Sequence, residues 1–81
     1  MNQDEVRKAV LAELMRIAPE LEAGDLVAGK LLRDQVDLDS MDWLNFLVAL
    51  HERFKVEIPE ADYAKLGTLD QVTAYLQAKA R

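Results

Sequence analysis

The junction that decides the fold reads Asp37-Leu38-Asp39-Ser40-Met41-Asp42 and runs directly into the apolar segment 43–54. Asp39 is a favourable N-cap residue, and Asp42, three residues later, occupies the reciprocal position of a capping box. We therefore predict that a helix begins at this junction. Ser40 falls in the first turn of that helix, where we expect its hydroxyl to be exposed.

The segment after the junction has the apolar periodicity of an amphipathic helix. We predict that one stripe of this helix faces the core, formed by Trp43, Leu47, Leu50 and Phe54. Met41, Leu44 and Val48 flank that stripe on the side that emerges near Ser40. The helix should end before Pro59, because a proline disfavours helical geometry in the residue that precedes it.

A first helix is predicted from about Gln3 to Ala18. Asn2 and Glu5 have capping-box spacing, apolar residues then repeat at helical intervals, and Pro19 ends the helix. Its solvated side is marked by charged residues, namely Arg7, Lys8, Glu13 and Arg16.

The connection over residues 20–38 is long for a compact domain. Leu26, Val36 and Leu38 are among its apolar anchors. A loop of this length is uncommon without local structure or a function, so we predict a short helical turn around residues 26–32.

The last third of the chain predicts two further helices. Residues 60–66 suit a short third helix, with Gly67 as its C-terminal cap. Thr68 and Gln71 have capping-box spacing and begin a fourth helix that reaches about residue 79. The predicted fold is an all-α, small four-helix bundle with a long first loop and a short third helix.

Composition limits the classes of function. The chain has 81 residues, 51% of them hydrophobic and 31% charged, which suits one domain over residues 1–81 with a small core. A net charge of −5 and a pI near 4.7 oppose binding to nucleic acid and to anionic membranes, which need clustered Lys and Arg. No apolar run approaches the roughly 20 residues that span a bilayer, and residues 1–5 do not resemble a secretory signal. We therefore expect a cytoplasmic protein without membrane insertion, and a monomer, since the apolar stripes can all be used internally.

The sequence gives little indication of a catalytic site or a metal-binding site. His51 is the only histidine, and its eleven-residue separation from Ser40 along one helix corresponds to roughly 16 Å of rise, too far for it to activate the serine. The aspartates around Ser40 superficially suggest a calcium loop, but the sixth loop position is Asp42 instead of glycine and the twelfth is Val48 instead of glutamate. We therefore predict no catalytic residue and no metal site.

The motif Asp39-Ser40-Met41-Asp42 resembles the phosphopantetheine attachment motif of acyl carrier proteins, Asp-Ser-Leu/Met-Asp/Glu. Residues 32–38 before it, and residues 47–50, Phe54 and residues 57–59 after it, resemble the flanking segments, so the resemblance covers essentially the whole chain. It implies that Ser40 receives a covalent 4'-phosphopantetheine arm from coenzyme A through a phosphopantetheinyl transferase. Acyl-loading, acyl-modifying and acyl-transfer enzymes then use the arm, and the chain is a carrier instead of an enzyme.

The resemblance also implies a partner-recognition surface and an acyl pocket. The recognition candidates lie around the motif and along the helix that follows it: Asp39, Met41, Asp42, Leu44, Asn45, Val48 and Glu52. The pocket candidates lie between the second and third helices: Leu47, Leu50, Phe54, Ile58, Leu66 and Leu69. A closed core that never admits acyl chains is the other interpretation of this second set.

Several residues depart from the family pattern. Asp37 stands where the family often has glycine, Asn45 and His51 stand where fatty-acid carriers commonly place acids, and Arg53 and Lys55 further dilute the acidic face. These departures favour a specialised lipid or polyketide pathway over general fatty-acid synthesis. Three alternatives stay open: a freestanding aminoacyl or peptidyl carrier, an unmodified helical adaptor that binds one partner helix, and, least favoured, a hydrolase using Ser40.

Overall fold

The computed structural model describes residues 2–79. Its helical elements are, in chain order, α1 (Gln3–Ile17), the 3-10 helix η1 (Ala23–Asp25), α2 (Leu32–Gln35), α3 (Ser40–Phe54), the 3-10 helix η2 (Glu60–Lys65) and α4 (Leu69–Lys79). Residues 2–79 contain no strand, only one isolated bridge between Leu31 and Thr68. The predicted all-α fold, with a long first connection and a short helix before the last one, is confirmed.

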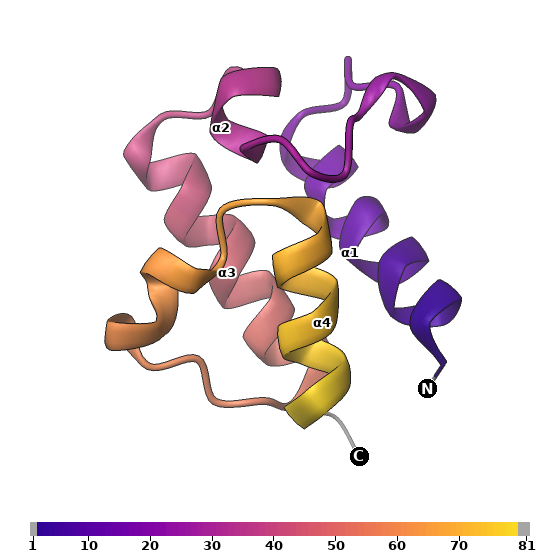
Figure 1. Cartoon of the computed structure of the whole chain (residues 1–81). Helices are drawn as coiled ribbons and strands as arrows, with labels where there is room; N and C mark the ends of the chain where they lie inside the picture. The colour runs from indigo at the N-terminus through magenta and orange to yellow at the C-terminus, as the bar shows by residue number, and fades with distance from the viewer. Residues whose placement is uncertain (1, 80–81) are drawn as a thin grey trace.

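Three long helices form the body of the molecule (Figure 1). α1 packs against both α3 and α4. The connection that carries η1 and α2 crosses one end of this bundle, and α3 begins at that same end (Figure 1). The start of α1 and the end of α4 both lie at the opposite end of the bundle (Figure 1). None of the helices within residues 2–79 has the length and apolar character that crossing a bilayer requires.

The core is built from the apolar faces of the three long helices. Trp43, Leu47 and Leu50 are buried as predicted, whereas Phe54 is only partly buried. Phe46 is fully buried, with its ring centroid 5.4 Å from that of Trp43, although the predicted stripe did not include it. Burying one such side chain is worth about 1.5–3 kcal/mol. The side chains that complete the fully buried core are Val6, Val10, Leu14, Leu32, Leu66, Leu69, Val72 and Leu76.

The predicted N-cap of α1 and the predicted capping box of α4 are formed. The backbone N–H of Glu5 donates to Asn2 Oδ1 over 2.8 Å at the start of α1. At the start of α4, the Gln71 N–H donates to Thr68 Oγ1 over 3.0 Å, and the Thr68 N–H donates back to Gln71 Oε1 over 3.1 Å. These bonds satisfy backbone donors that a helix start would otherwise leave unpaired.

The prediction that Glu13 lies on the solvated side of α1 is wrong, because Glu13 is buried. Its side chain is only 4% exposed, because its carboxylate lies between α1 and α3. Arg16 Nη1 donates to Glu13 Oε1 over 3.0 Å, and Arg53 Nη1 on α3 donates to Oε2 over 3.4 Å. The charge is therefore buried with two cationic partners that periodicity along α1 alone does not indicate.

The helical turn predicted around residues 26–32 is wrong. Helical turns occur instead on either side, in η1 and α2, and residues 26–31 are irregular. The side chain of Gln35 holds this irregular segment: the Val27 N–H donates to Gln35 Oε1 over 2.7 Å, and Gln35 Nε2 donates to the carbonyls of Val27 and Lys30 over 2.9 and 3.0 Å. One amide side chain thus replaces the backbone bonds that a helix would have supplied.

Gly67 also has a different role from the predicted left-handed helix cap. Its φ is not positive; the residue with positive φ is Lys55, which caps the C-terminus of α3 at φ 54°. A Cβ at Gly67 would lie 2.8 Å from Leu31 Cδ2. Next to this contact, the Leu32 N–H donates to the Gly67 carbonyl over 2.8 Å. A side chain at this position would displace the end of the exposed Leu31 side chain, because the first connection passes close to the start of α4.

We predict that Gln35→Glu loosens the irregular segment. The new carboxylate keeps an acceptor for the Val27 N–H but places oxygen against the carbonyls of Val27 and Lys30. Both carbonyls lose the bond from Gln35 Nε2, and the Val27 carbonyl keeps only the Lys30 N–H. The expected loss in unfolding free energy is about 1–2 kcal/mol, with faster hydrogen exchange of the Val27 amide. Urea denaturation and amide exchange would measure both. The matched control is Gln77→Glu on α4, and equal effects of the two changes would contradict the assignment.

A second prediction concerns the start of α3, where the Asp42 N–H donates to Asp39 Oδ1 over 2.8 Å. Asp39→Ala removes this cap and should cost about 1 kcal/mol of unfolding free energy. Asp39→Asn keeps the acceptor oxygen and should cost only a few tenths of that amount. Urea denaturation of the two variants separates the hydrogen bond from the charge. Equal losses would show that the charge, and not the cap, holds the helix start.

Candidate functional site

Ser40 is the first residue of α3 and its side chain is exposed. The residues on both sides of it are fixed: Val36 and Leu38 before it and Trp43 after it are buried. The Trp43 N–H donates to the Asp39 carbonyl over 3.0 Å, which closes the first turn. The predicted placement of the Ser40 hydroxyl, exposed at the mouth of the helix, is confirmed.

The backbone donors of the first turn are only partly used. Asp39 occupies the N–H of Asp42. Within residues 2–79, the N–H groups of Ser40 and Met41 have no hydrogen-bond partner. Two free donors and the positive end of the helix dipole therefore lie beside the Ser40 hydroxyl, an arrangement that suits an anionic substituent on its oxygen.

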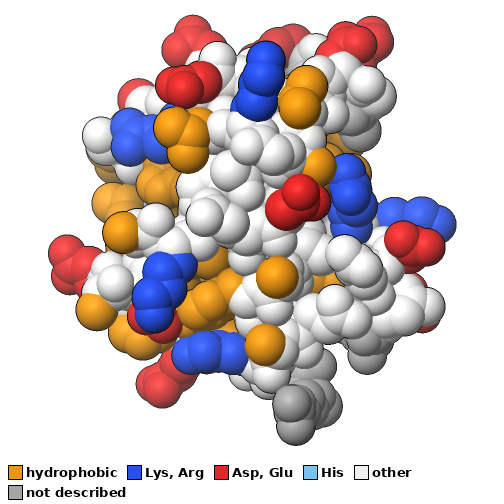
Figure 2. All heavy atoms as spheres, viewed as in Figure 1, with side chains coloured by type: hydrophobic (Ala, Val, Ile, Leu, Met, Phe, Trp, Pro, Cys, Tyr) orange, Lys and Arg blue, Asp and Glu red, His pale blue; other side chains and the backbone are white. Residues whose placement is uncertain are grey.

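An apolar strip, which we call the α3 strip, begins next to Ser40 and consists of Met41, Leu44 and Val48. Their exposed fractions are 72%, 46% and 48%, so this side of α3 is not used by the core. Surface hydrophobic atoms are visible on the left side of Figure 2, where α3 and η2 lie in Figure 1. The α3 strip is a surface available to a partner.

Charge is unevenly distributed along α3. Asp39 and Asp42 stand at its start, beside Asp37 on the preceding connection, whereas Arg53 and Lys55 stand at its end. Figure 2 shows acidic side chains along the upper edge of the molecule, the end at which α3 begins. The surroundings of Ser40 are therefore acidic, and a basic partner surface complements them.

The other two recognition candidates lie in a different place from the α3 strip. Asn45 and Glu52 are exposed and line a cleft of about 530 Å³ between α1 and α3, together with Glu13, Arg16 and Arg53. The structure thus divides the predicted recognition residues into the acidic pair at the start of α3, the α3 strip and the polar cleft.

A groove of about 300 Å³ opens between α3 and the segment that leads into η2. We call it the α3–η2 groove; its lining is Leu47, Val48, His51, Glu57, Ile58, Pro59 and Tyr63. Of the six pocket candidates, Leu47 and Ile58 line this groove. Leu50, Leu66 and Leu69 are 0–1% exposed in the core, and Phe54 is partly buried against that core.

His51 is part of this groove and is held in one orientation. Its Nδ1 lies 2.7 Å from the carbonyl oxygen of Val56. A carbonyl can only accept, so Nδ1 carries the hydrogen, and Nε2 of the neutral ring is an acceptor. The left-handed turn at Lys55 brings Val56 back toward His51. Sequence reasoning placed His51 on a helix face but did not find this bond.

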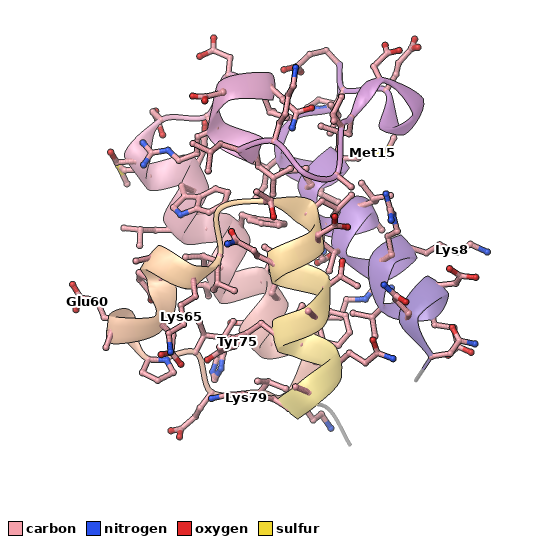
Figure 3. All side chains as sticks on the ribbon, in the orientation of Figure 1. Lys8, Met15, Glu60, Lys65, Tyr75 and Lys79 are labelled. Atoms are coloured by element: carbon pink, nitrogen blue, oxygen red, sulfur yellow. The ribbon has the colours of Figure 1, made fainter. Side chains whose placement is uncertain are left out.

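The segment η2 is held to α4 by a cluster around Asp62, which sequence reasoning missed. Tyr75 Oη donates to Asp62 Oδ2 over 2.6 Å. Lys65 Nζ lies 3.4 Å from Oδ1 and Lys79 Nζ lies 3.8 Å from Oδ2. Figure 3 shows Lys65, Tyr75 and Lys79 converging from η2 and α4, whereas Glu60 points outward. The only signal in the sequence was the amphipathic spacing of α4, which does not pair Tyr75 with Asp62.

The pKa values of this cluster are shifted in the directions that its contacts require. The hydrogen bond from Tyr75, followed by the nearby lysines, lowers the pKa of Asp62. Burial and the bond to Asp62 raise the pKa of Tyr75, and the interaction with Tyr75 raises the pKa of Lys79. All three groups therefore keep their neutral-pH protonation states. Within residues 2–79, no group of three or more His, Asp or Glu side chains is arranged to hold a metal ion.

Comparison with known proteins agrees with the resemblance carried by the motif. A family model described as the phosphopantetheine attachment site matches residues 6–76. An acyl carrier protein of Thermosynechococcus vestitus is 32% identical over 82 residues, which cover 98% of this chain and 96% of the relative. A meromycolate extension acyl carrier protein of Mycolicibacterium aurum is 32% identical over 69 residues, covering 85% of this chain and 71% of the relative. An acyl carrier protein of Rhodococcus erythropolis is 28% identical over 74 residues, covering 88% of this chain and 81% of the relative.

These matches span nearly the whole chain and agree with the helical architecture and with an exposed serine at the start of a capped helix. The chain therefore belongs to the acyl carrier protein family, the phosphopantetheine-binding carriers of acyl groups.

Proposed function

We propose that Ser40 carries the 4'-phosphopantetheine arm and that the protein presents acyl groups on this arm to partner enzymes. The observation that carries the proposal is the exposed Ser40 hydroxyl at the first position of α3. It lies inside the Asp-Ser-Met-Asp motif and inside the region matched by the phosphopantetheine-attachment family. No other serine exists in the chain.

The first turn of α3 fits the linkage that the arm would make. A phosphodiester on Ser40 would lie beside the free N–H groups of Ser40 and Met41. The partial positive charge of a helix N-terminus favours such an anion by about 0.3–1 kcal/mol. Asp39 is already bonded to the Asp42 N–H, so the cap does not need to break.

The attachment step is a phosphoryl transfer from coenzyme A to the Ser40 hydroxyl. Ser40 Oγ forms a bond to the phosphorus of coenzyme A that bears the pantetheine, the bond from that phosphorus to the nucleotide phosphate breaks, and 3',5'-adenosine bisphosphate leaves. The hydroxyl proton passes to a base of the transferase. His51, the only histidine of the chain, does not supply this base, because it is eleven residues further along α3 and donates to Val56.

The composition indicates which functions the arm would supply and which the protein would supply. The chain contains no cysteine, and the bound arm would supply the thiol on which acyl groups are carried as thioesters. The protein's own residues fix the position of the hydroxyl, offer a docking surface and shelter the cargo. We therefore infer a carrier without catalytic activity of its own, acting in fatty-acid synthesis or in a specialised lipid pathway.

The partners we propose are a phosphopantetheinyl transferase and acyl-handling enzymes with basic docking surfaces. Asp39 and Asp42 would attract such surfaces, and Met41 would give apolar contact in the centre of the contact area. Leu44 and Val48 extend this contact along the α3 strip. Acidic groups at the rim set the association rate, whereas the apolar anchor sets the dissociation rate.

The attachment prediction is tested by intact mass. Incubation with coenzyme A, magnesium and a broad-specificity phosphopantetheinyl transferase should add one phosphopantetheine to the wild-type chain. Ser40→Ala should gain none while remaining folded by circular dichroism. A folded wild type that gains no mass with several transferases would overturn the proposal and favour an unmodified adaptor.

The docking prediction uses two methionines that differ in position. Met41→Ser should lower kcat/KM of the transferase roughly fivefold, because an apolar interface anchor is worth about 1 kcal/mol or more. Its unfolding free energy should change by less than about 0.5 kcal/mol, since Met41 is exposed. The control is Met15→Ser, an exposed methionine that lies on α1 instead of α3. Normal modification of the Met41 variant would exclude Met41 from the interface.

A further inference from the structure

The polar cleft between α1 and α3 contains two arginines that share one buried carboxylate. Glu13 is only 4% exposed, and it accepts from Arg16 Nη1 over 3.0 Å and from Arg53 Nη1 over 3.4 Å. One carboxylate balances one guanidinium group, so these three side chains leave one positive charge unbalanced. The net charge of the chain is −5. The cleft is therefore electrostatically different from the acidic surroundings of Ser40.

The bonds to Glu13 use only part of each guanidinium group. Within residues 2–79, only the Nη1 atoms of Arg16 and Arg53 form hydrogen bonds to protein groups. The two side chains are 77% and 47% exposed, so the donors on Nε and Nη2 remain for a second anion. A guanidinium group binds a carboxylate through two parallel N–H···O bonds, which are stronger than neutral hydrogen bonds. The cleft can thus accept a second carboxylate beside Glu13.

The walls of the cleft favour such a contact. Ile17 on α1 and Ala49 on α3 are partly buried and supply apolar surface to the cleft, whose volume is about 530 Å³. Apolar walls reduce the local content of water, and an ion pair is stronger where less water surrounds it. A carboxylate in the cleft would therefore be bound more tightly than one at a fully open surface.

Glu52 is the other carboxylate among the described residues that line the cleft. It precedes Arg53 by one residue, so it lies about 100° away around the axis of α3. It also follows Val48 by four residues, which places it beside the α3 strip and away from α1. A ligand carboxylate on the α1 side of the cleft therefore contacts the arginines without facing Glu52.

Opposite charges stand at the two ends of one side of α3. Asp42 and Arg53 are eleven residues apart, which is close to three full turns and about 16 Å of rise. The start of the helix complements a basic partner surface, whereas the cleft complements an acidic one. A partner element that satisfies both must carry opposite charges about three turns apart.

We infer that the cleft binds a carboxylate side chain from an acidic segment of a partner enzyme, and that Arg16 and Arg53 recognise it. The inference rests on the proposed docking of basic partner surfaces at the start of α3. Together the two contacts fix the direction in which a partner helix lies along α3, because the reversed direction places like charges opposite each other. A partner with a uniformly basic surface makes only the first contact.

The test uses the unmodified, isotopically labelled protein and two blocked, alanine-rich helical peptides at low ionic strength, where exposed ion pairs are least screened. The bipolar peptide has a glutamate pair in its first turn and an arginine pair about three turns later, an order that also stabilises its helix. The reference peptide has glutamine in place of both glutamates. The bipolar peptide should shift the amides of Ile17, Ala49 and the start of α3, whereas the reference peptide should shift only the start of α3.

Three arginine variants assign the cleft shifts to side chains. Arg16→Gln and Arg53→Gln should each weaken binding of the bipolar peptide roughly 3- to 5-fold relative to Arg7→Gln, the upper range for an exposed ion pair, without weakening the reference peptide. Arg7→Gln is the matched control, because it removes the same charge and lies nine residues from Arg16, on the opposite side of α1. Circular dichroism checks that the variants are folded. Since Arg16 is mostly exposed, its variant decides the test if the change at Arg53 unfolds the protein.

Failure of this inference can be distinguished from failure of the proposed function, because peptide binding does not involve modification of Ser40. If the bipolar peptide leaves the amides of Ile17 and Ala49 unshifted, or if both peptides shift them equally, the cleft is not a carboxylate site. An Arg7→Gln variant that weakens the bipolar peptide as much as Arg16→Gln would also overturn the inference, because net charge alone would then explain binding. A wild type that gains no phosphopantetheine would overturn the proposed function and leave the carboxylate site standing.

Discussion

The hydrogen bond from the Asp42 N–H to the Asp39 carboxylate is the interaction on which the functional geometry depends. It sets the residue at which α3 begins, and successive residues of the helix then point about 100° apart around its axis. Ser40 is exposed and Trp43 is buried only in the observed register. The cap therefore couples the chemistry at the surface to the packing of the core.

The two sides of α3 are supported by different physical forces. Toward α1, apolar burial and the enclosed Glu13 carboxylate hold the helix in place. Toward η2 there is little apolar burial, since no residue of η2 is buried. η2 depends instead on Asp62 and its bonds to Tyr75 and the two lysines. Segments held by few buried contacts open at lower free energy than the core, so the wall of the groove is the part of the site that yields first.

Local signals in the sequence predicted the parts of the fold that depend on local interactions. The caps at Asn2, Asp39 and Thr68 follow from residue type and spacing within one turn, and all three were predicted. The features that were missed join residues distant in sequence. Gln35 bonds to a segment eight residues earlier, and Asp62 bonds to Tyr75 thirteen residues later. No periodicity encodes such pairs, because they depend on how the connections fold back on the helices. The motif identified Ser40 as the candidate attachment residue. The polar residues that line the α3–η2 groove could be identified only from the structure.

The placement of the start of α1 and the end of α4 has a practical consequence for how this carrier can be immobilised or fused. The start of α1 and the end of α4 lie together at the end of the bundle opposite the start of α3 (Figure 1). A support or a fused domain attached at either end would therefore face away from Ser40. The reactive hydroxyl would remain turned toward solution, so an array of such molecules could be displayed in one orientation without blocking the enzymes that must reach it.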